Sequence, residues 1–178
     1  MIIKLIVIII YFIVILAVFV PLFVAGLSLA PWVPAPVDVP DRVNKLAKLK
    51  PGQVFYEIGC GDARVCHYIA SKNPKAKVIG IEMARTMYLW SRFKCFLKPL
   101  KNLTIIHANA LKVDLSDADI VYFYMVEPAI NNKLKPKLLK DLKKGARIIS
   151  YACRILEWKG KKMSEPGKSS KAVHVYTV

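Results

Sequence analysis

Cysteine and acidic residues are scarce in this sequence. Its 178 residues include four Cys that form no C-x-x-C pair and no metal-ligand spacing, so we expect neither a disulfide scaffold nor a metal site. Twelve Asp and Glu face 28 Lys and Arg, which gives a net charge of +16. That surplus favours anionic neighbours, such as phospholipid head groups, nucleic acid or an acidic protein surface. The 55% share of hydrophobic residues excludes a disordered chain.

Charged residues are absent between residues 5 and 37. About 20 apolar residues span the hydrocarbon core of a bilayer, and the run over residues 5–30 exceeds that length. The alternative is a cleaved signal peptide with a small-residue site at Ser28-Leu29-Ala30, but the run is longer than an ordinary signal sequence and Pro31 would follow the cut. We therefore predict a transmembrane anchor over residues 1–30.

A proline-rich stretch follows the apolar run. Pro31, Pro34 and Pro36 favour extended chain, so residues 31–40 are predicted to form a linker that leaves the membrane, with Trp32 at the interface. Its alternative role is a strand that covers the active face of the domain. Lysines and arginines soon after the anchor favour a domain on the cytoplasmic side of a single-pass membrane protein. These residues are Arg42, Lys45, Lys48 and Lys50.

Residues 41–178 have the pattern of one α/β domain. Short β-branched and aromatic runs alternate with helical patterns, which predicts a Rossmann-like, mostly parallel sheet with helices on both faces, preceded by the transmembrane helix. Strands are expected at 54–58, 77–82, 103–107, 118–124, 146–153 and 172–178. Helices are expected at 63–71, 84–97 and 131–144, a short one begins at Pro40, and residues 159–171 are expected to form a loop.

A glycine motif follows the first strand of this domain. Glu57-Ile58-Gly59-Cys60-Gly61-Asp62 is an acidic-x-Gly-x-Gly pattern, in which glycine lets a ligand approach the backbone closely. A dinucleotide site would need a third glycine where Arg64 stands. The carboxylate of Asp62 can bind an ammonium group of a ligand and would repel pyrophosphate. The motif resembles the first motif of class I methyltransferases, which predicts S-adenosylmethionine as the cofactor.

Residues after the next two strands complete a predicted adenosine site. Glu82 lies 25 residues after Glu57, at the end of a strand, where a carboxylate can accept hydrogen bonds from both ribose hydroxyls. Met83 can pack on adenine, and Asn109-Ala110 follows the third strand, where the methyltransferases that this chain resembles bind the adenine amino group. The predicted cofactor-binding residues are Glu57, Gly59, Cys60, Gly61, Asp62, Glu82, Met83, Asn109 and Ala110.

Further stretches along the chain carry a more specific resemblance. They are Pro34-Ala35-Pro36, Gly59-Cys60-Gly61-Asp62-Ala63-Arg64, Leu89-Trp90-Ser91-Arg92, Leu134-Lys135-Pro136-Lys137-Leu138 and Val173-His174-Val175-Tyr176-Thr177-Val178. With them the chain resembles a family of small, membrane-anchored seven-β-strand methyltransferases that has prokaryotic members. Mitochondrial relatives in that family methylate lysines of the adenine nucleotide translocase and of the c subunit of ATP synthase. Ala63 departs from the family pattern, where a third glycine is usual.

The resemblance implies N-methylation of a lysine on a membrane or membrane-proximal protein. Tyr124 and Glu127, after the fourth strand, are the candidate catalytic residues, Tyr to orient the amine and Glu to accept its proton or hydrogen bond. Residues 124–128 lack the Asn/Asp-Pro-Pro-Tyr motif of amino-group methylators, which argues against methylation of nucleic-acid bases. One alternative is a lipid or quinone methyltransferase with Trp90, Tyr124 and Trp158 around an apolar pocket. Another is a membrane scaffold that binds no cofactor.

Basic residues are dense in the last third of the domain. Between Lys133 and Lys171 there are 13 Lys or Arg against three acidic residues. The functional interpretation is contact with anionic phospholipid, and the alternative is a solvated basic face. Nucleic acid also fits the charge, but no basic-aromatic binding motif accompanies it.

Overall fold

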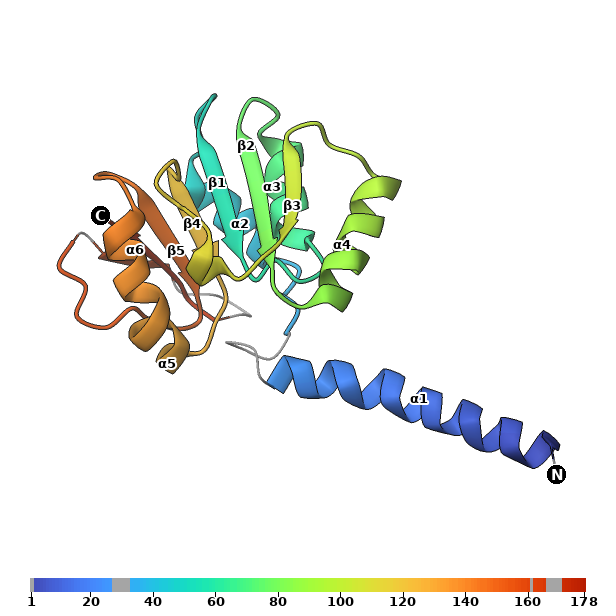
Figure 1. Ribbon diagram of the computed structural model, residues 1–178. Helices are drawn as coiled ribbons and strands as arrows, with labels where there is room; N and C mark the ends of the chain where they lie inside the picture. The colour runs from blue at the N-terminus through green and yellow to red at the C-terminus, as the bar shows by residue number, and fades with distance from the viewer. Residues whose placement is uncertain (1, 27–32, 161, 166–170) are drawn as a thin grey trace.

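The computed structural model describes residues 2–26, 33–160, 162–165 and 171–178. At its centre is a seven-stranded sheet in the order β3-β2-β1-β4-β5-β7-β6 (Figure 1). The strands are β1 Val54–Ile58, β2 Lys77–Glu82, β3 Leu103–His107, β4 Ile120–Phe123, β5 Arg147–Tyr151, β6 Lys162–Glu165 and β7 Val173–Thr177. Strands β1 to β5 pair in parallel, and β7 pairs antiparallel with both β5 and β6. The predicted Rossmann-like, mostly parallel sheet is confirmed.

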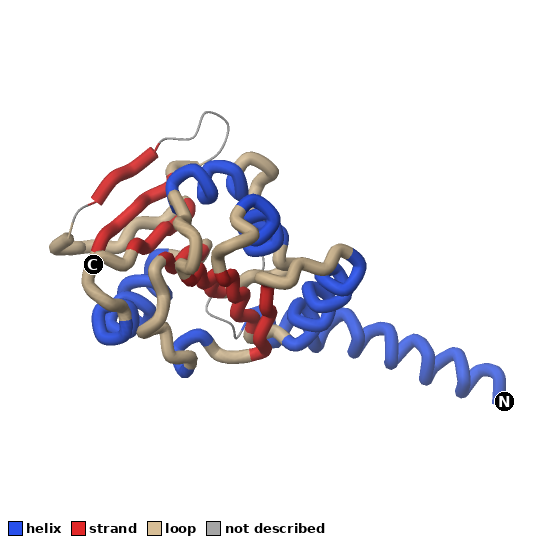
Figure 2. The backbone as a smooth tube through the Cα atoms, turned by 90° about the horizontal axis from the view of Figure 1, so that it is seen from above, coloured by secondary structure: helices blue, strands red, loops and turns tan. Residues whose placement is uncertain are grey.

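Helices cover both faces of this sheet (Figures 1 and 2). The helices are α1 Ile2–Gly26, α2 Val39–Ala47, α3 Arg64–Lys72, α4 Arg85–Leu97, α5 Glu127–Ala129 and α6 Lys135–Asp141, with a 3₁₀ turn at Ala110–Lys112 and a π turn at Ile130–Leu134. One core lies between the sheet and α2 and α3, with α4 at its margin, and the second lies between the sheet and α6. Two covered faces explain why the strands are almost continuously apolar.

Side chains of β1 alternate between the two cores. Phe55 packs into the core with α3, whereas Tyr56 and Ile58 pack into the core with α6. Glu57 is the exception, because a carboxyl group takes the place of an apolar side chain on the α3 face and is only 4% exposed. A buried carboxyl group is costly, so its presence in a central strand indicates a function.

Two segments differ from the sequence-based expectations. A single helix over 131–144 is predicted, but α5 begins at Glu127 and a π turn separates it from α6. Pro136 has no N–H to donate, and the wider turn, in which Lys135 N–H donates to Ile130 O, adjusts the helix just before it. The predicted loop over 159–171 contains strand β6, which pairs with the antiparallel β7 at the edge of the sheet.

Helix α1 extends away from the domain (Figure 1), and nearly all of its described side chains are exposed. Among the residues whose side chains are described, no helix meets the length and hydropathy that a membrane crossing requires. That finding does not support the transmembrane anchor predicted for residues 1–30, which stays a prediction. Trp32 and the candidate cleavage site at 28–30 lie outside the described residues.

A pair of neighbouring leucines in α6 tests the packing of the second core. Leu138 is fully buried and Leu139 is 54% exposed. Replacing Leu138 with Ala leaves a cavity and should lower the free energy of unfolding by about 2–5 kcal/mol. Leu139→Ala should lower it by less than about 1 kcal/mol, because no core contact is lost. Urea unfolding followed by circular dichroism measures both, and equal effects would contradict the assigned face of α6.

Candidate active site

The loop after β1 makes a tight turn at the carboxyl edge of the sheet. Gly59 and Gly61 have φ angles of +72° and +53°, in the left-handed region that favours glycine. The N–H groups of Gly59 and Cys60 both donate to Ile81 O, at 2.8 and 3.0 Å, which ties the loop to β2. Ala63, the departure from the family pattern, also has a positive φ, +62°. It therefore keeps a backbone conformation that glycine adopts more easily.

Glu82 joins the two loops that form the predicted cofactor site. One carboxylate oxygen accepts the N–H of Gly61 at 2.8 Å, and the other accepts the N–H of Ala84 at 2.8 Å. The side chain is only 8% exposed, so these bonds fix its position. Each oxygen keeps a free lone pair, which suits the vicinal hydroxyls of a ribose.

Glu57 lies beneath the same loop, against the start of α3. Its carboxyl group accepts the N–H of Cys66 at 2.7 Å. Burial raises the pKa of Glu57 to about 8, and the nearby charges of Asp62 and Glu82 add to the rise. Three carboxyl groups thus crowd one end of the sheet. Below about pH 8 Glu57 is largely protonated, so the carboxylates of Asp62 and Glu82 supply the negative charge that disfavours pyrophosphate.

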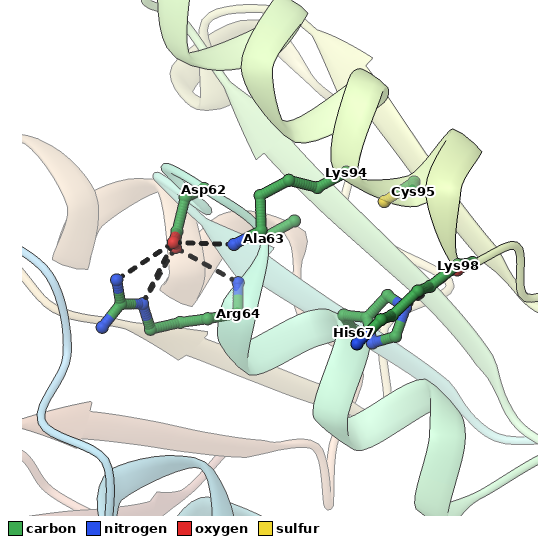
Figure 3. Close-up of a pocket in the computed structure, with 7 residues that line it drawn as sticks. All are labelled: Asp62, Ala63, Arg64, His67, Lys94, Cys95 and Lys98. Carbon is green, nitrogen blue, oxygen red and sulfur yellow. Dashed lines mark hydrogen bonds and ion pairs between the residues drawn. The ribbon is translucent and has the colours of Figure 1, made fainter.

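Asp62 points into a cavity between α3 and α4 (Figure 3). Arg64 Nε and Lys94 Nζ contact its carboxylate at 3.0 and 2.9 Å. Burial raises the pKa of Asp62, but hydrogen bonds from these two cations outweigh burial and hold the pKa below its usual value. The cavity has a volume of about 200 Å³. Its lining residues are Asp62, Ala63, Arg64, His67, Lys94, Cys95 and Lys98.

Arg64 also connects this site to the proline-rich segment. Its guanidinium donates to Ala35 O at 3.0 Å, and Ala35 is buried against the core on the α3 face. This part of the predicted linker therefore packs on the domain beside the cofactor loop. That placement agrees with the alternative role of a covering segment.

The remaining predicted cofactor residues follow β2 and β3. Met83 is exposed, and its carbonyl oxygen lies 3.0 Å from His107 Nε2. Asn109 Oδ1 accepts the N–H of Leu111 at 2.9 Å and caps a 3₁₀ turn that begins at Ala110. The structure thus places all nine predicted residues in or beside the loops after β1, β2 and β3.

Tyr124 directly follows β4, next to the glycine loop. Phe123 pairs with Ile58, so Tyr124 lies beside Gly59 in the register. Its ring meets Tyr151, which ends β5, edge to face with centroids 4.8 Å apart. Glu127 is exposed at the start of α5, and among the described residues no hydrogen bond joins its side chain to Tyr124.

The three aromatic residues predicted to surround an apolar pocket lie in different parts of the fold. Trp158 packs on Tyr176 in the core with α6, whereas Tyr124 packs against the core with α3 and Trp90 lies on the open face of α4. These three aromatic residues therefore do not share one apolar pocket.

Sequence reasoning missed Arg64, Lys94 and Tyr151 as site residues. Lys94 lies 32 residues from Asp62 and Tyr151 lies 27 residues from Tyr124, so the sequence carries no local signal for either pairing. Arg64, two residues from Asp62, could have been found from that spacing.

The chain matches a known protein family. Residues 57–162 match the ANTKMT methyltransferase domain. The chain belongs to the ANTKMT methyltransferase family. A protein-lysine N-methyltransferase of Saccharolobus islandicus (strain REY15A) is 30% identical over 156 residues, which cover 83% of this chain and 93% of the relative. A probable ribosomal RNA small subunit methyltransferase A of Methanosarcina acetivorans is 27% identical over 72% of this chain and 44% of its own length.

A solved methyltransferase structure is also similar to this chain. An RNA methyltransferase from Salinibacter ruber in complex with S-adenosyl-L-homocysteine has a TM-score of 0.75 and 25% identity, over 82% of this chain and 94% of its own. This ANTKMT family member is an S-adenosylmethionine-dependent methyltransferase, and a non-catalytic scaffold is no longer a competing interpretation.

The residues at the carboxyl edge fit this cofactor. When bound, S-adenosylmethionine supplies a methyl group on a positively charged sulfur. Glu82 would hold the ribose hydroxyls, the loop from Gly59 to Asp62 would hold the amino acid part, and Met83 and Asn109 would border the adenine. An in-line displacement depends on alignment more than on acid-base groups, which explains why so many backbone bonds fix these loops.

Glu82 provides the sharpest test of this assignment. Glu82→Gln leaves one amide oxygen where two carboxylate oxygens stood, so either Gly61 or Ala84 loses its acceptor. We expect the Kd for S-adenosylhomocysteine to rise at least about tenfold, because charge-assisted hydrogen bonds are lost. Isothermal titration calorimetry measures it, with Asp114→Asn, at an exposed turn, as the control. An unchanged Kd would remove Glu82 from the site.

Glu57 should make stability depend on pH. A carboxyl group whose pKa is raised in the folded state makes its full contribution to the free energy of unfolding below its unfolded pKa of about 4.5. That contribution is lost as the pH rises through the folded pKa of about 8. The cofactor-free wild type should therefore lose a few kcal/mol of unfolding free energy across that window. Glu57→Gln cannot ionise and should lose much less. Urea unfolding at both ends of the window compares the two, and parallel pH profiles would contradict the raised pKa.

Proposed function

We propose that this enzyme methylates the side-chain nitrogen of a lysine on a membrane or membrane-proximal protein. The aromatic pair of Tyr124 and Tyr151 beside the glycine loop carries the proposal. The name of the Saccharolobus relative, a protein-lysine N-methyltransferase, supports the same chemistry.

A lysine must reach the cofactor as a neutral amine. An apolar, partly closed approach lowers the pKa of the amine by desolvation, and tyrosine rings line such an approach well. Tyr124 can also accept a hydrogen bond from the amine through its oxygen and so orient the nitrogen lone pair. The methylated nitrogen then releases a proton, which would pass through solvent water to the carboxylate of Glu127, exposed at the start of α5.

A lipid, quinone or other small membrane-borne substrate is the second candidate. The exposed aromatic side chains of α4 favour a site near lipid. The separation of Trp90, Tyr124 and Trp158 gives this candidate no shared pocket, so the lysine proposal has more support.

Membrane attachment is part of the proposal. Helix α1 has 25 residues, about 37 Å at 1.5 Å per residue, and its only charged residue is Lys4. All of its described large apolar side chains except Ile15 are about half exposed or more, which is unfavourable in water. We propose that α1 anchors the enzyme as a single-pass protein with the domain on the cytoplasmic side, where the positive residues that follow it would lie.

An anionic phospholipid surface is the proposed neighbour of the basic domain. The segment from Lys133 to Lys171 would contribute less to lipid binding than its charge suggests, because several of its cations form ion pairs or hydrogen bonds within the protein. Lys143 pairs with Asp119 at 2.7 Å, Lys135 donates to Leu156 O at 2.6 Å, and Arg147 donates to carbonyl oxygens at the end of α2.

Radiolabelled S-adenosylmethionine tests the substrate class. Membranes that contain the full-length enzyme are incubated with the label, and protein, lipid and nucleic acid are then separated. We expect label in protein, recovered as methyl-lysine after hydrolysis. Asp62→Ala should lose most of the label, because Asp62 supports the cofactor loop, whereas Leu139→Ala should keep it.

The distribution of label decides between the candidates. Label in the lipid extract would replace the lysine proposal with the lipid or quinone candidate. Label in protein at a residue other than lysine, or in nucleic acid, would contradict both. Tyr124→Phe adds a finer test, since loss of its oxygen should lower kcat while the Kd for S-adenosylhomocysteine stays the same.

A further inference from the structure

Helix α4 presents an apolar stripe that the domain does not cover. Its members are Leu89, Trp90, Phe93, Phe96 and Leu97, which are each between 50% and 79% exposed. Their spacing of i, i+1, i+4, i+7 and i+8 places them on one helix face. The rings of Trp90 and Phe93 stack with centroids 5.8 Å apart. A contiguous patch of this kind on a small domain marks an interaction site.

The opposite face of α4 is the one that packs on the domain. Ser91 is fully buried, and Tyr88 and Cys95 pack against the core shared with α3. Tyr88 also stacks on His107 at 5.2 Å. The outward direction of the stripe is therefore fixed by packing on the other side, so the helix cannot turn to bury it.

Positive charge flanks the apolar stripe. Arg85 and Arg92 are exposed along one side of it, and Lys98 and Lys101 follow the end of the helix in exposed positions. No acidic residue occurs between Glu82 and Asp114. A Trp- and Phe-rich stripe with arginine and lysine at its borders is the composition of a helix that lies in the interface of an anionic bilayer.

The position of α1 points to the same surface. In both views α1 extends away from the domain on the side where α4 forms the outer layer (Figures 1 and 2). A bilayer that held α1 would therefore be met by α4 before the rest of the domain.

We infer that α4 is a membrane-docking helix whose stripe of Leu89, Trp90, Phe93, Phe96 and Leu97 enters the interface of an anionic phospholipid bilayer. The inference rests on the proposed membrane attachment and assigns its contact to α4, in place of the basic segment 133–171. Helix α4 begins just after Glu82 and Met83, so docking brings the cofactor loops close to the bilayer. The enzyme would then reach substrate nitrogens within a short distance of the membrane surface.

Tryptophan fluorescence tests the docking of α4 directly. The full-length enzyme is reconstituted into vesicles of phosphatidylcholine with phosphatidylglycerol, with or without brominated acyl chains. The difference in emission between the wild type and the Trp90→Phe variant is the signal of Trp90. This substitution should affect folding little, because Trp90 is half exposed. We expect that signal to shift to shorter wavelength on reconstitution and to be quenched by the bromines. Arg85→Gln with Arg92→Gln should weaken the quenching, as should vesicles of phosphatidylcholine alone.

Trp158 provides the matched control. It is buried in the core with α6, so the emission lost on Trp158→Phe substitution should not be quenched. A Trp90 signal that escapes the bromines while the protein floats with the vesicles would overturn the inference. A blue shift without quenching would also overturn it, since a protein or a second copy would then cover α4. Fluorescence reports no methyl transfer, so failure here is distinct from failure of the proposed activity.

Discussion

The carboxylate of Glu82 is the constraint on which the active edge of this enzyme depends. It accepts one N–H from the loop after β1 and one from the loop after β2, and it lies at the carboxyl end of a central parallel strand. Together with the N–H groups of Gly59 and Cys60, which donate to Ile81 O, this buried carboxylate fixes the relative positions of the two loops. The ribose contacts expected of Glu82 use lone pairs that these bonds leave free.

Buried and paired charged groups gather around this edge of the sheet. Burial raises the pKa of Glu57, the nearby Asp62 and Glu82 add to the rise, and Arg64 with Lys94 holds the Asp62 carboxylate in place. Arg64 also reaches the backbone of Ala35, in the segment that leads from α1. A physical connection therefore runs from the segment after α1 to the cofactor loop.

Elements with strong local patterns were predicted from the sequence with accurate bounds. The expected ranges for β1, β2 and β3 agree with the structure, because buried parallel strands are short apolar runs bounded by turns. The edge strand β6 was not predicted, since its polar sequence forms a strand only through pairing with β7. The π turn before α6 was also missed, because the pattern of apolar residues continues through it.

The sequence by itself determined the fold class, the glycine loop and the carboxylates of the predicted cofactor site, because these depend on residue type at short spacing. Tertiary structure decided the partners of those groups. Lys94 reaches Asp62 from another helix, Tyr151 meets Tyr124 from the neighbouring strand, and the stripe of α4 is left uncovered. Each of these depends on how distant segments pack, which no local pattern encodes.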